Sequence, residues 1–145
     1  MRLDPDETRR RFADARVARL ATVTADGAAH LVPICFAVVG RKVFSAVDDK
    51  PKTSTALRRL DNVRAHDRVS LLVDHYDEDW KTLWWVRADG LARVVYDGQT
   101  HERGVVALRA KYAQYAAHAL DGAVLAVDVK SWTGWAAGTS PARER

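Results

Sequence analysis

Six runs rich in β-branched, aromatic and other apolar residues account for most of the hydrophobic positions and are predicted to be strands. They cover residues 17–24, 29–39, 42–47, 68–76, 80–96 and 123–135. Asp26-Gly27 and Gly40-Arg41 stand between consecutive runs, where such pairs favour hairpin turns. Gly90 lies inside the longest run and indicates a bulge or a close approach of another backbone.

A helix is predicted near the N-terminus, over residues 5–16. Asp4 is suited to cap this helix, Pro5 to occupy its first position and Glu7 its third. Phe12 is then expected on the inner face.

Two further helices are predicted, over residues 53–65 and 99–118. Thr53 or Ser54 is suited to cap the first of them. Residues that recur at helical spacing mark the faces expected to be buried. These are Leu57, Leu60 and Val63 in the first helix, and Val105, Val106, Leu108, Tyr112 and Tyr115 in the second.

Six strands joined mostly by hairpins, with helices inserted between them, predict a mainly β fold: a six-stranded antiparallel split β-barrel. The expected organisation is a single cofactor-binding domain over residues 1–145, with an N-terminal helix in residues 1–16 and a flexible tail over 138–145. A barrel of this size is filled by its own side chains. A planar cofactor is therefore expected on the outside, at a boundary between subunits.

Composition fits a soluble protein of one domain, with 48% hydrophobic and 29% charged residues. No apolar run reaches the roughly 18 residues that span a bilayer, and the N-terminus lacks the apolar core of a secretory signal, so a cytoplasmic protein is expected. The net charge is +4, but basic and acidic residues are interspersed. This pattern argues against nucleic acid as a partner and favours a small anionic ligand.

The candidate reactive side chains do not form a recognisable catalytic or metal-binding set. Cys35 lies in an apolar run and is predicted to be a small buried hydrophobic residue. The five histidines show no paired-ligand spacing, so no metal site is expected. Neither a Ser-His-Asp set nor a carboxylate pair is visible, which is consistent with chemistry carried by a bound cofactor.

The loop that precedes residues 53–65 is the clearest candidate for a binding site. Lys50, Lys52 and Thr53 converge where a helix begins, and unpaired backbone N–H groups there favour an anion such as phosphate. The alternative is a solvated basic loop. Arg58 and Arg59, one turn later, are expected on the solvent-exposed face of the helix, and contact with the anionic tail of a cofactor is the alternative.

Trp84 and Trp85 are adjacent in a predicted strand, so their side chains should point to opposite faces of the sheet. One is expected in the core. The other is expected at an interface or against a ligand, because an exposed Trp leaves a large apolar area in water.

The succession RLATVTADG, KPKTSTALRRL, RVSLLVDHYDEDW, WWVRADGLARV and VLAVDVKSWTGW resembles the split-barrel flavin-binding family that includes pyridoxamine 5′-phosphate oxidase. It is most similar to the actinobacterial branch identified as deazaflavin (coenzyme F420)-dependent oxidoreductases. The resemblance implies a homodimer with cofactors in grooves between subunits. The C-terminal SWTGWAAGTSPARER differs from the arginine-containing substrate segment of the oxidases, which argues against pyridoxamine phosphate as the substrate.

The resemblance also implies roles for particular residues. The strand with His30, Val32, Pro33 and Ile34 would line the tricyclic ring, and Val47 and Asp48 would pass along the sugar-alcohol chain. Lys50, Lys52 and Thr53 would hold the phosphate, and Trp84 or Trp85 would lie near the ring or the other subunit.

The implied activity is hydride transfer between a deazaflavin and a small molecule that the sequence does not identify. An FMN-dependent oxidase or reductase of the same fold is the nearest alternative, because FMN shares the tricyclic ring and phosphate. A non-catalytic dimer that only carries the cofactor is the alternative of another class.

Overall fold

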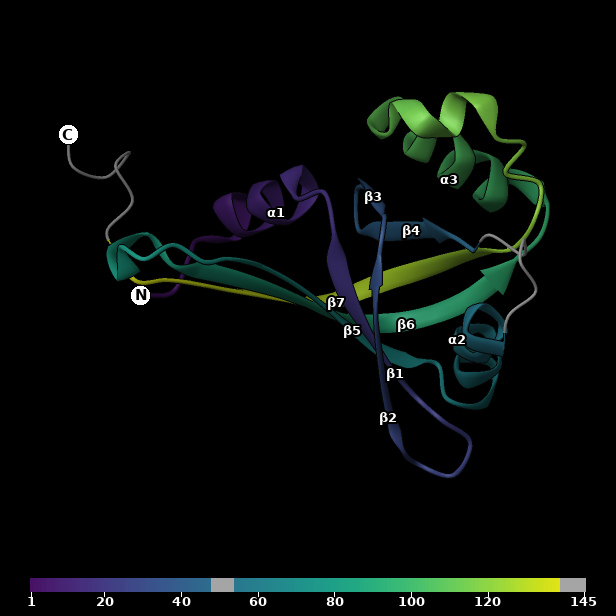
Figure 1. Ribbon diagram of the computed structural model, residues 1–145, viewed down its shortest axis with the longest axis horizontal. Coiled ribbons are helices and arrows are strands. Elements are labelled where there is room, and N and C mark those ends of the chain that lie inside the picture. The colour runs from purple at the N-terminus through teal and green to yellow at the C-terminus, as the bar shows by residue number, and fades with distance from the viewer. Residues whose placement is uncertain (48–53, 139–145) are drawn as a thin grey trace.

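A computed structural model describes residues 1–47 and 54–138 of the chain. Figure 1 shows a long twisted sheet that protrudes at one end and carries helices toward the other. The helices are α1 (Pro5–Asp14), α2 (Ser54–Ala65), α3 (Gly98–Lys111) and the short 3₁₀ segments η1 (Trp80–Thr82) and η2 (Ala113–Ala117). The strands are β1 (Ala18–Val23), β2 (Ala29–Ile34), β3 (Ala37–Val39), β4 (Lys42–Ala46), β5 (Arg68–His75), β6 (Trp84–Val95) and β7 (Val124–Ala136).

The strands form one antiparallel sheet in the order β2-β1-β5-β6-β7-β4-β3. The prediction of a mainly β, antiparallel fold with inserted helices is therefore confirmed. The prediction of a closed six-stranded barrel is wrong, because the sheet has seven strands and its ladder is open between β2 and β3.

The seventh strand arises because the run predicted over residues 29–39 divides into β2 and β3. Cys35 and Phe36 lie between the two strands, and each strand pairs with a different neighbour, β2 with β1 and β3 with β4. Since only two residues join them, the outer strands of the sheet lie close to each other, and the sheet must curl. The periodicity of a run does not reveal a change of pairing partner within it.

The predicted turns and the irregularity at Gly90 are present. Gly27 (φ +90°) and Gly40 (φ +59°) adopt left-handed backbone conformations between consecutive strands. The register of β6 and β7 shifts between Asp89 and Gly90, and a Cβ on Gly90 would lie 2.2 Å from the backbone oxygen of Asp128. Gly90 therefore combines both expected features, a bulge and a close backbone approach.

The helices close the inner face of the sheet. The Asp4 side chain caps α1 by accepting from the Glu7 N–H at 2.9 Å, and Phe12 is fully buried against Phe36 and Trp132. Helix α2 packs on β1 and β6, and α3 packs on β3, β4 and β7.

Helix boundaries and faces differ from the prediction at several points. Helix α1 ends at Asp14 rather than at residue 16. Helix α3 ends at Lys111 rather than continuing to residue 118, because Tyr112 is extended and η2 follows. Leu57 and Val106, expected to be buried, are 42% and 69% exposed. Helical spacing identifies the apolar face of a helix. The width of the sheet surface against which the helix packs determines how much of that face is buried.

Candidate functional site

The strand predicted to line the cofactor ring, β2, is an edge strand with two distinct faces. Ile34 is buried and His30 and Val32 are partly buried, so these side chains face inward. Leu31 and Pro33 are exposed on the outer face. Pro33 lacks an N–H and accordingly lies in a strand with one unpaired edge.

Of the residues predicted to contact the sugar-alcohol chain and the phosphate, the structure describes only Val47. Val47 is buried, and its N–H donates to the Ala123 carbonyl at 2.9 Å. Asp48, Lys50, Lys52 and Thr53 lie outside the described residues. Their assignment stays a prediction.

A buried cation lies one turn of helix beyond that loop. Arg59 in α2 is partly buried, and its Nε has no hydrogen-bond partner among the described residues. Burial lowers the pKa of its guanidinium. The prediction that Arg59 belongs to a solvent-exposed face is wrong, whereas the neighbouring Arg58 is exposed.

Contacts between α2 and the sheet place Asn62, on the same side of the helix as Arg59, beside the strand that pairs with β2. Asn62, three residues after Arg59 and thus on the same helix face, donates to the Thr22 hydroxyl of β1 at 3.0 Å. Thr22 is the cross-strand partner of His30, whose buried Nδ1 also has no partner in the described part of the chain. Unsatisfied buried polar atoms are uncommon in folded proteins. A guanidinium and an imidazole with free polar atoms therefore suit an anionic ligand with hydrogen-bonding groups.

Trp84 and Trp85 point to opposite faces, as predicted. Trp84 packs against the core, with its ring stacked on His75 (centroids 6.2 Å apart) and 5.3 Å from the Arg11 guanidinium carbon. Trp85 lies on the outer face, 6.0 Å from the guanidinium carbon of Arg87.

The outer face of the sheet carries an apolar surface that no described element covers. The strand register places Leu31, Ala21, Leu72 and Trp85 on this face, and Trp85 pairs with Trp135 of β7. Leu31 is 67% exposed, and Leu72 and Trp135 are each 37% exposed. A groove of about 750 Å³ runs along this surface. We call the surface the outer groove face and define it by Leu31, Leu72, Trp85, Arg87 and Trp135.

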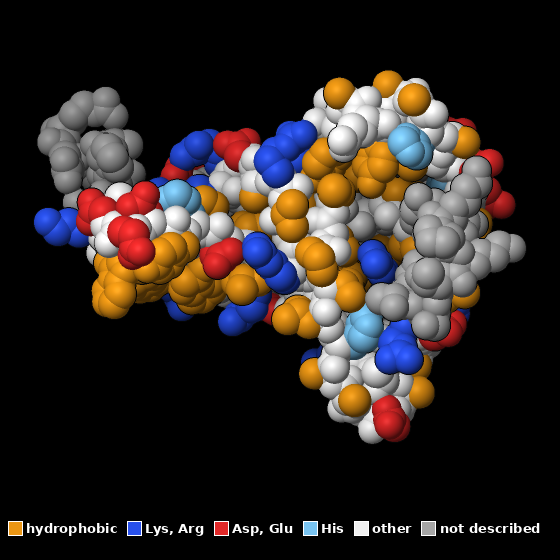
Figure 2. Space-filling model, in the orientation of Figure 1, with side chains coloured by type: hydrophobic (Ala, Val, Ile, Leu, Met, Phe, Trp, Pro, Cys, Tyr) orange, Lys and Arg blue, Asp and Glu red, His pale blue; other side chains and the backbone are white. Residues whose placement is uncertain are grey.

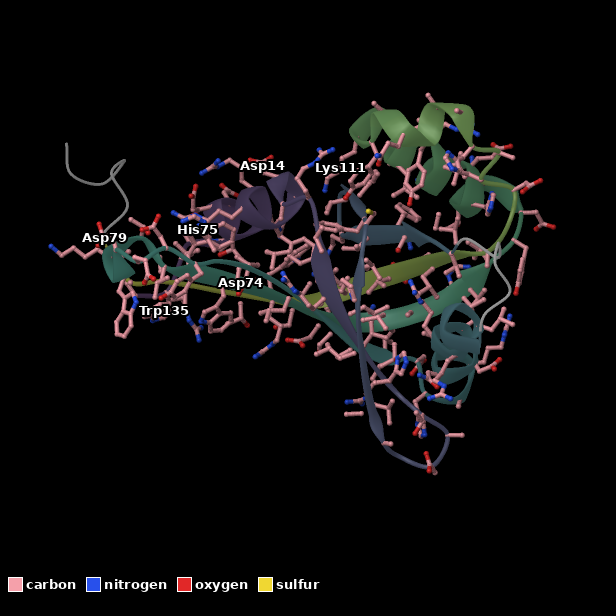
Figure 3. All side chains as sticks on the ribbon, in the orientation of Figure 1. Asp14, Asp74, His75, Asp79, Lys111 and Trp135 are labelled. Carbon is pink, nitrogen blue, oxygen red and sulfur yellow. The ribbon has the colours of Figure 1, made fainter. Side chains whose placement is uncertain are left out.

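Hydrophobic side chains also gather along the lower edge of the protruding end of the sheet in Figure 2. Figure 3 shows Trp135 on the same side of that end, near Asp79. Tyr76 and Trp80 are 63% and 67% exposed, so the apolar surface continues to the tip of the hairpin that joins β5 and β6. Contiguous apolar surface of this kind is typical of interfaces.

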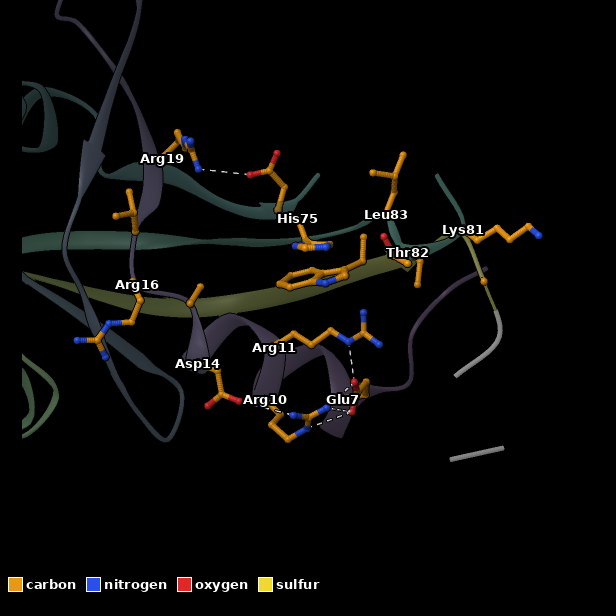
Figure 4. A pocket seen from close by; sticks show the side chains of 16 residues that line it. Glu7, Arg10, Arg11, Asp14, Arg16, Arg19, His75, Lys81, Thr82 and Leu83 are labelled. Atoms are coloured by element: carbon orange, nitrogen blue, oxygen red, sulfur yellow. Dashed lines mark hydrogen bonds and ion pairs between the residues drawn. The ribbon is translucent and has the colours of Figure 1, made fainter. Parts of the chain in front are cut away.

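A second cleft, of about 800 Å³, lies between α1 and the protruding end of the sheet (Figure 4). In this α1 cleft, Figure 4 shows an indole ring between His75 and Arg11, the two residues that contact the ring of Trp84. Glu7 accepts hydrogen bonds from Arg11 (2.6 Å) and Arg10 (2.7 Å), and these bonds hold the pKa of its carboxyl below the usual range.

Cys35 is exposed, so the prediction of a small buried residue is wrong. Its position in the link between β2 and β3 explains this, because the chain there leaves one ladder and has not yet joined the next. The following residue, Phe36, is fixed by Tyr112, whose hydroxyl accepts from the Phe36 N–H and lies 3.0 Å from the Phe36 carbonyl.

No group of three or more His, Cys, Asp or Glu side chains suited to a metal ion occurs within residues 1–47 and 54–138. In the same residues, no helix combines the length and apolar character needed to cross a membrane.

The sequence profile of the family described as "Pyridoxamine 5'-phosphate oxidase" matches residues 4–136, nearly the whole chain. The chain belongs to the pyridoxamine 5′-phosphate oxidase family. No curated protein matches it. Membership in this family accounts for the antiparallel sheet and its inserted helices. This match identifies the family and not the deazaflavin branch within it.

Solved structures share the fold of this pyridoxamine 5′-phosphate oxidase family member. A conserved hypothetical protein from Mycobacterium tuberculosis is 20% identical, with a TM-score of 0.76 over 93% of this chain and 86% of that one. An FAD-binding protein from Mesorhizobium loti is 19% identical, with a TM-score of 0.74 over 92% and 93%. A heme-binding protein from Mycobacterium smegmatis is 19% identical, with a TM-score of 0.75 over 95% of this chain and 57% of that one.

Sequence reasoning missed two features of this family member. Arg59 was assigned to solvent because charged residues on short helices usually are exposed, although its spacing of three from the buried Asn62 places both on one face. Trp135 lines the outer groove face, a position that sequence reasoning did not identify. Its alternation with Gly134 along β7 is the signal that places it outward.

Proposed function

We propose that this protein is an oxidoreductase that binds a flavin-type cofactor, and more specifically that it transfers a hydride between a deazaflavin (coenzyme F420) and a small organic molecule. The single observation that carries the proposal is the partly buried Arg59, a cation whose buried Nε has no hydrogen-bond partner and which forms no ion pair among the described residues. A buried charge without a counter-ion is costly. A cofactor phosphate would supply the missing anion.

The residues present fit such a cofactor. Arg59 would hold the phosphate together with Lys50, Lys52 and Thr53 of the adjoining loop, since a guanidinium suits phosphate geometry. His30 would donate or accept a hydrogen bond through its buried Nδ1. The backbone of β2 at Pro33 would lie beside the ring. When bound, the cofactor supplies the redox chemistry, and the protein supplies orientation and electrostatics.

We also propose that the active unit is a homodimer that buries the outer groove face, with the cofactors at the subunit boundary. The support is the exposed apolar surface of Leu31, Leu72 and Trp135, flanked by ion pairs such as Arg19–Asp74 (3.3 Å). An apolar centre with a polar rim is typical of a stable interface. Trp85 would then lie at the boundary between the two subunits.

FMN is the alternative cofactor, favoured by the flavin-binding protein of similar fold from M. loti. A dimer that carries the cofactor without catalysing a reaction is the other alternative. Titration of the purified protein with FMN and with the deazaflavin, followed by the quenching of tryptophan fluorescence, compares the two ligands directly. A single-turnover experiment measures hydride transfer from the bound reduced cofactor to candidate acceptors. It distinguishes an enzyme from a protein that only carries the cofactor.

The decisive variant is Arg59→Ala. Loss of a charge-assisted hydrogen bond of roughly 1.5–3 kcal/mol should weaken binding of the preferred cofactor about 10- to 150-fold. Arg58→Ala is the matched control, because Arg58 is the adjacent residue and is exposed. Equal affinities for the wild type and the Arg59 variant would contradict the proposal. Higher salt should weaken wild-type binding more than that of the variant.

A further inference from the structure

The hairpin that joins β5 and β6 ends in exposed aromatic and acidic side chains. Tyr76 and Trp80 are 63% and 67% exposed, and the Trp80 Nε1 donates to the Tyr76 hydroxyl at 3.3 Å. That hydroxyl donates to the Glu78 carboxylate at 2.9 Å, and the Asp77 carboxylate accepts from the Asp79 N–H at 2.7 Å. Figure 2 shows acidic side chains beside hydrophobic ones at this protruding end, where Figure 3 labels Asp79. These hydrogen bonds hold the five residues, which we call the hairpin tip, in a defined arrangement.

A second groove opens on the outer face of the sheet, at the other end of β5. It has a volume of about 620 Å³, and its lining combines the cations Arg68 and Lys130 with apolar side chains such as Val23 and Leu91. Ala21 lines both this groove and the groove along the outer groove face, so the two form a continuous surface. The eight residues of β5 separate this basic groove from the hairpin tip by roughly 25 Å.

The two ends of this surface carry opposite charges. In the part of the chain that the structure describes, Arg68 and Lys130 form no ion pair. Asp89, the carboxylate in the lining of the basic groove, is paired with Arg87 at 2.9 Å. Asp128, whose pKa the charge of Lys130 helps to lower, is ion-paired with another lysine. The basic groove therefore has two uncompensated cations, whereas the hairpin tip has three exposed carboxylates.

This distribution of charge distinguishes two ways of packing two copies of the chain. Copies that bury the same face are related by a two-fold axis. If their strands ran in the same direction, the two hairpin tips would meet and their carboxylates would repel each other. If their strands ran in opposite directions, each hairpin tip would meet the basic groove of the other copy. The axis would then pass near Leu72 and Arg87, which pair across β5 and β6 between the two ends.

We propose that the hairpin tip of each subunit docks in the basic groove of a second copy of this chain, so that the two sheets pack with their strands in opposite directions. Tyr76 and Trp80 would cover the apolar lining of the groove, and the carboxylates of the tip would lie beside Arg68 and Lys130. An indole beside a guanidinium adds a cation–π attraction. This inference rests on the homodimer of the proposed function, and it adds the direction of packing and the residues that each subunit contributes.

Charge exchange between the two ends tests the contact. Arg68→Glu and Glu78→Lys should each raise the dissociation constant of the dimer at least about tenfold in sedimentation equilibrium, because each places like charges together at two symmetric contacts. The double variant should restore most of the affinity, since the charges are then exchanged. Arg103→Glu is the matched control, because Arg103 is exposed on α3, which packs on the inner face. A double variant that is no tighter than the weaker single variant would overturn the proposal.

Cross-linking tests the direction of packing. In a Cys35→Ser background, the chain with both Glu78→Cys and Arg68→Cys should give a cross-linked dimer with a short bismaleimide, whereas Glu78→Cys alone should not. A cross-linked dimer from Glu78→Cys alone would show that the tips meet, and would overturn the proposal. A dimer that sediments as such but is cross-linked in neither variant would overturn this contact and leave the homodimer intact. A monomeric wild type would overturn both.

Discussion

At the scale of single residues, burial determines the charge states that matter in this protein. Lys111 and Arg59 are both basic residues whose pKa is lowered, in each case chiefly by desolvation. The two side chains differ in the contacts that their charged groups make. Lys111 lies over aromatic rings and donates to a carbonyl, whereas Arg59 has a free Nε. Of these two side chains, Arg59 is therefore the one with a donor left for an anion among the described residues.

Lys111 should make the stability of the protein depend on pH. Its folded-state pKa of about 8 lies below the ordinary value, so between about pH 8 and 10.5 the unfolded chain binds more protons than the folded one. Stability contributed by this group therefore rises with pH across that window. Urea unfolding should show the wild type gaining about 1–2 kcal/mol relative to Lys111→Met between pH 7 and 10.5, after allowance for solvent screening. A difference that is constant with pH would contradict this prediction.

At the scale of elements, the long β6–β7 pair forms the centre of the sheet and bends at Gly90. The register shift there lets the backbone of β7 approach so closely that a side chain has no room. The two strands extend beyond the bulge to the protruding end, where they carry Trp85 and Trp135 to the outer groove face. The bulge therefore contributes to where the aromatic surface lies.

Gly90→Ala should destabilise the protein by about 1–3 kcal/mol, because its Cβ would lie 2.2 Å from the Asp128 oxygen and the backbone would have to move. Thermal or urea unfolding measures this loss. Ser131→Ala is the control, since Ser131 is exposed and pairs across from Asp89 at the same irregularity. A Gly90 variant as stable as the wild type would show that the strands relax freely at the bulge.

At the scale of the whole molecule, one face of the sheet is covered by helices and the other exposes large apolar side chains. A second copy of the chain would bury the outer groove face, and stable homodimers usually bury more than about 2,000 Å² in total. Sedimentation equilibrium should give a mass of twice the 16.2 kDa chain. A folded monomer at micromolar concentration would refute the dimer and the subunit-boundary site with it.

Leu31→Glu should convert the dimer to a folded monomer, because it places a charge in the apolar surface of the proposed interface at a position that is 67% exposed in one chain. Val106→Glu is the matched control, since Val106 in α3 is 69% exposed but lies outside the outer groove face. The control should stay dimeric and melt at a similar temperature. Dissociation by both variants would indicate a different interface.

The sequence by itself determined the local elements of this protein. Asp4 and Pro5 placed the start of α1, Gly27 and Gly40 placed two turns, and alternation placed Trp84 and Trp85 on opposite faces. These features depend on backbone preferences and on spacing within a few residues, and both can be read from the local sequence. The resemblance that covered nearly its whole length supplied the family, which the match over residues 4–136 confirmed.

Only the tertiary structure decided which strands pair and which charges are buried. The division of residues 29–39 into β2 and β3, the exposure of Cys35 and the burial of Arg59 all depend on partners distant in sequence. Lys111 shows the same dependence, since its pKa reflects Arg16, which is far from it in the chain. Burial and pairing are properties of the assembled sheet and helices, so periodicity within a single run cannot specify them.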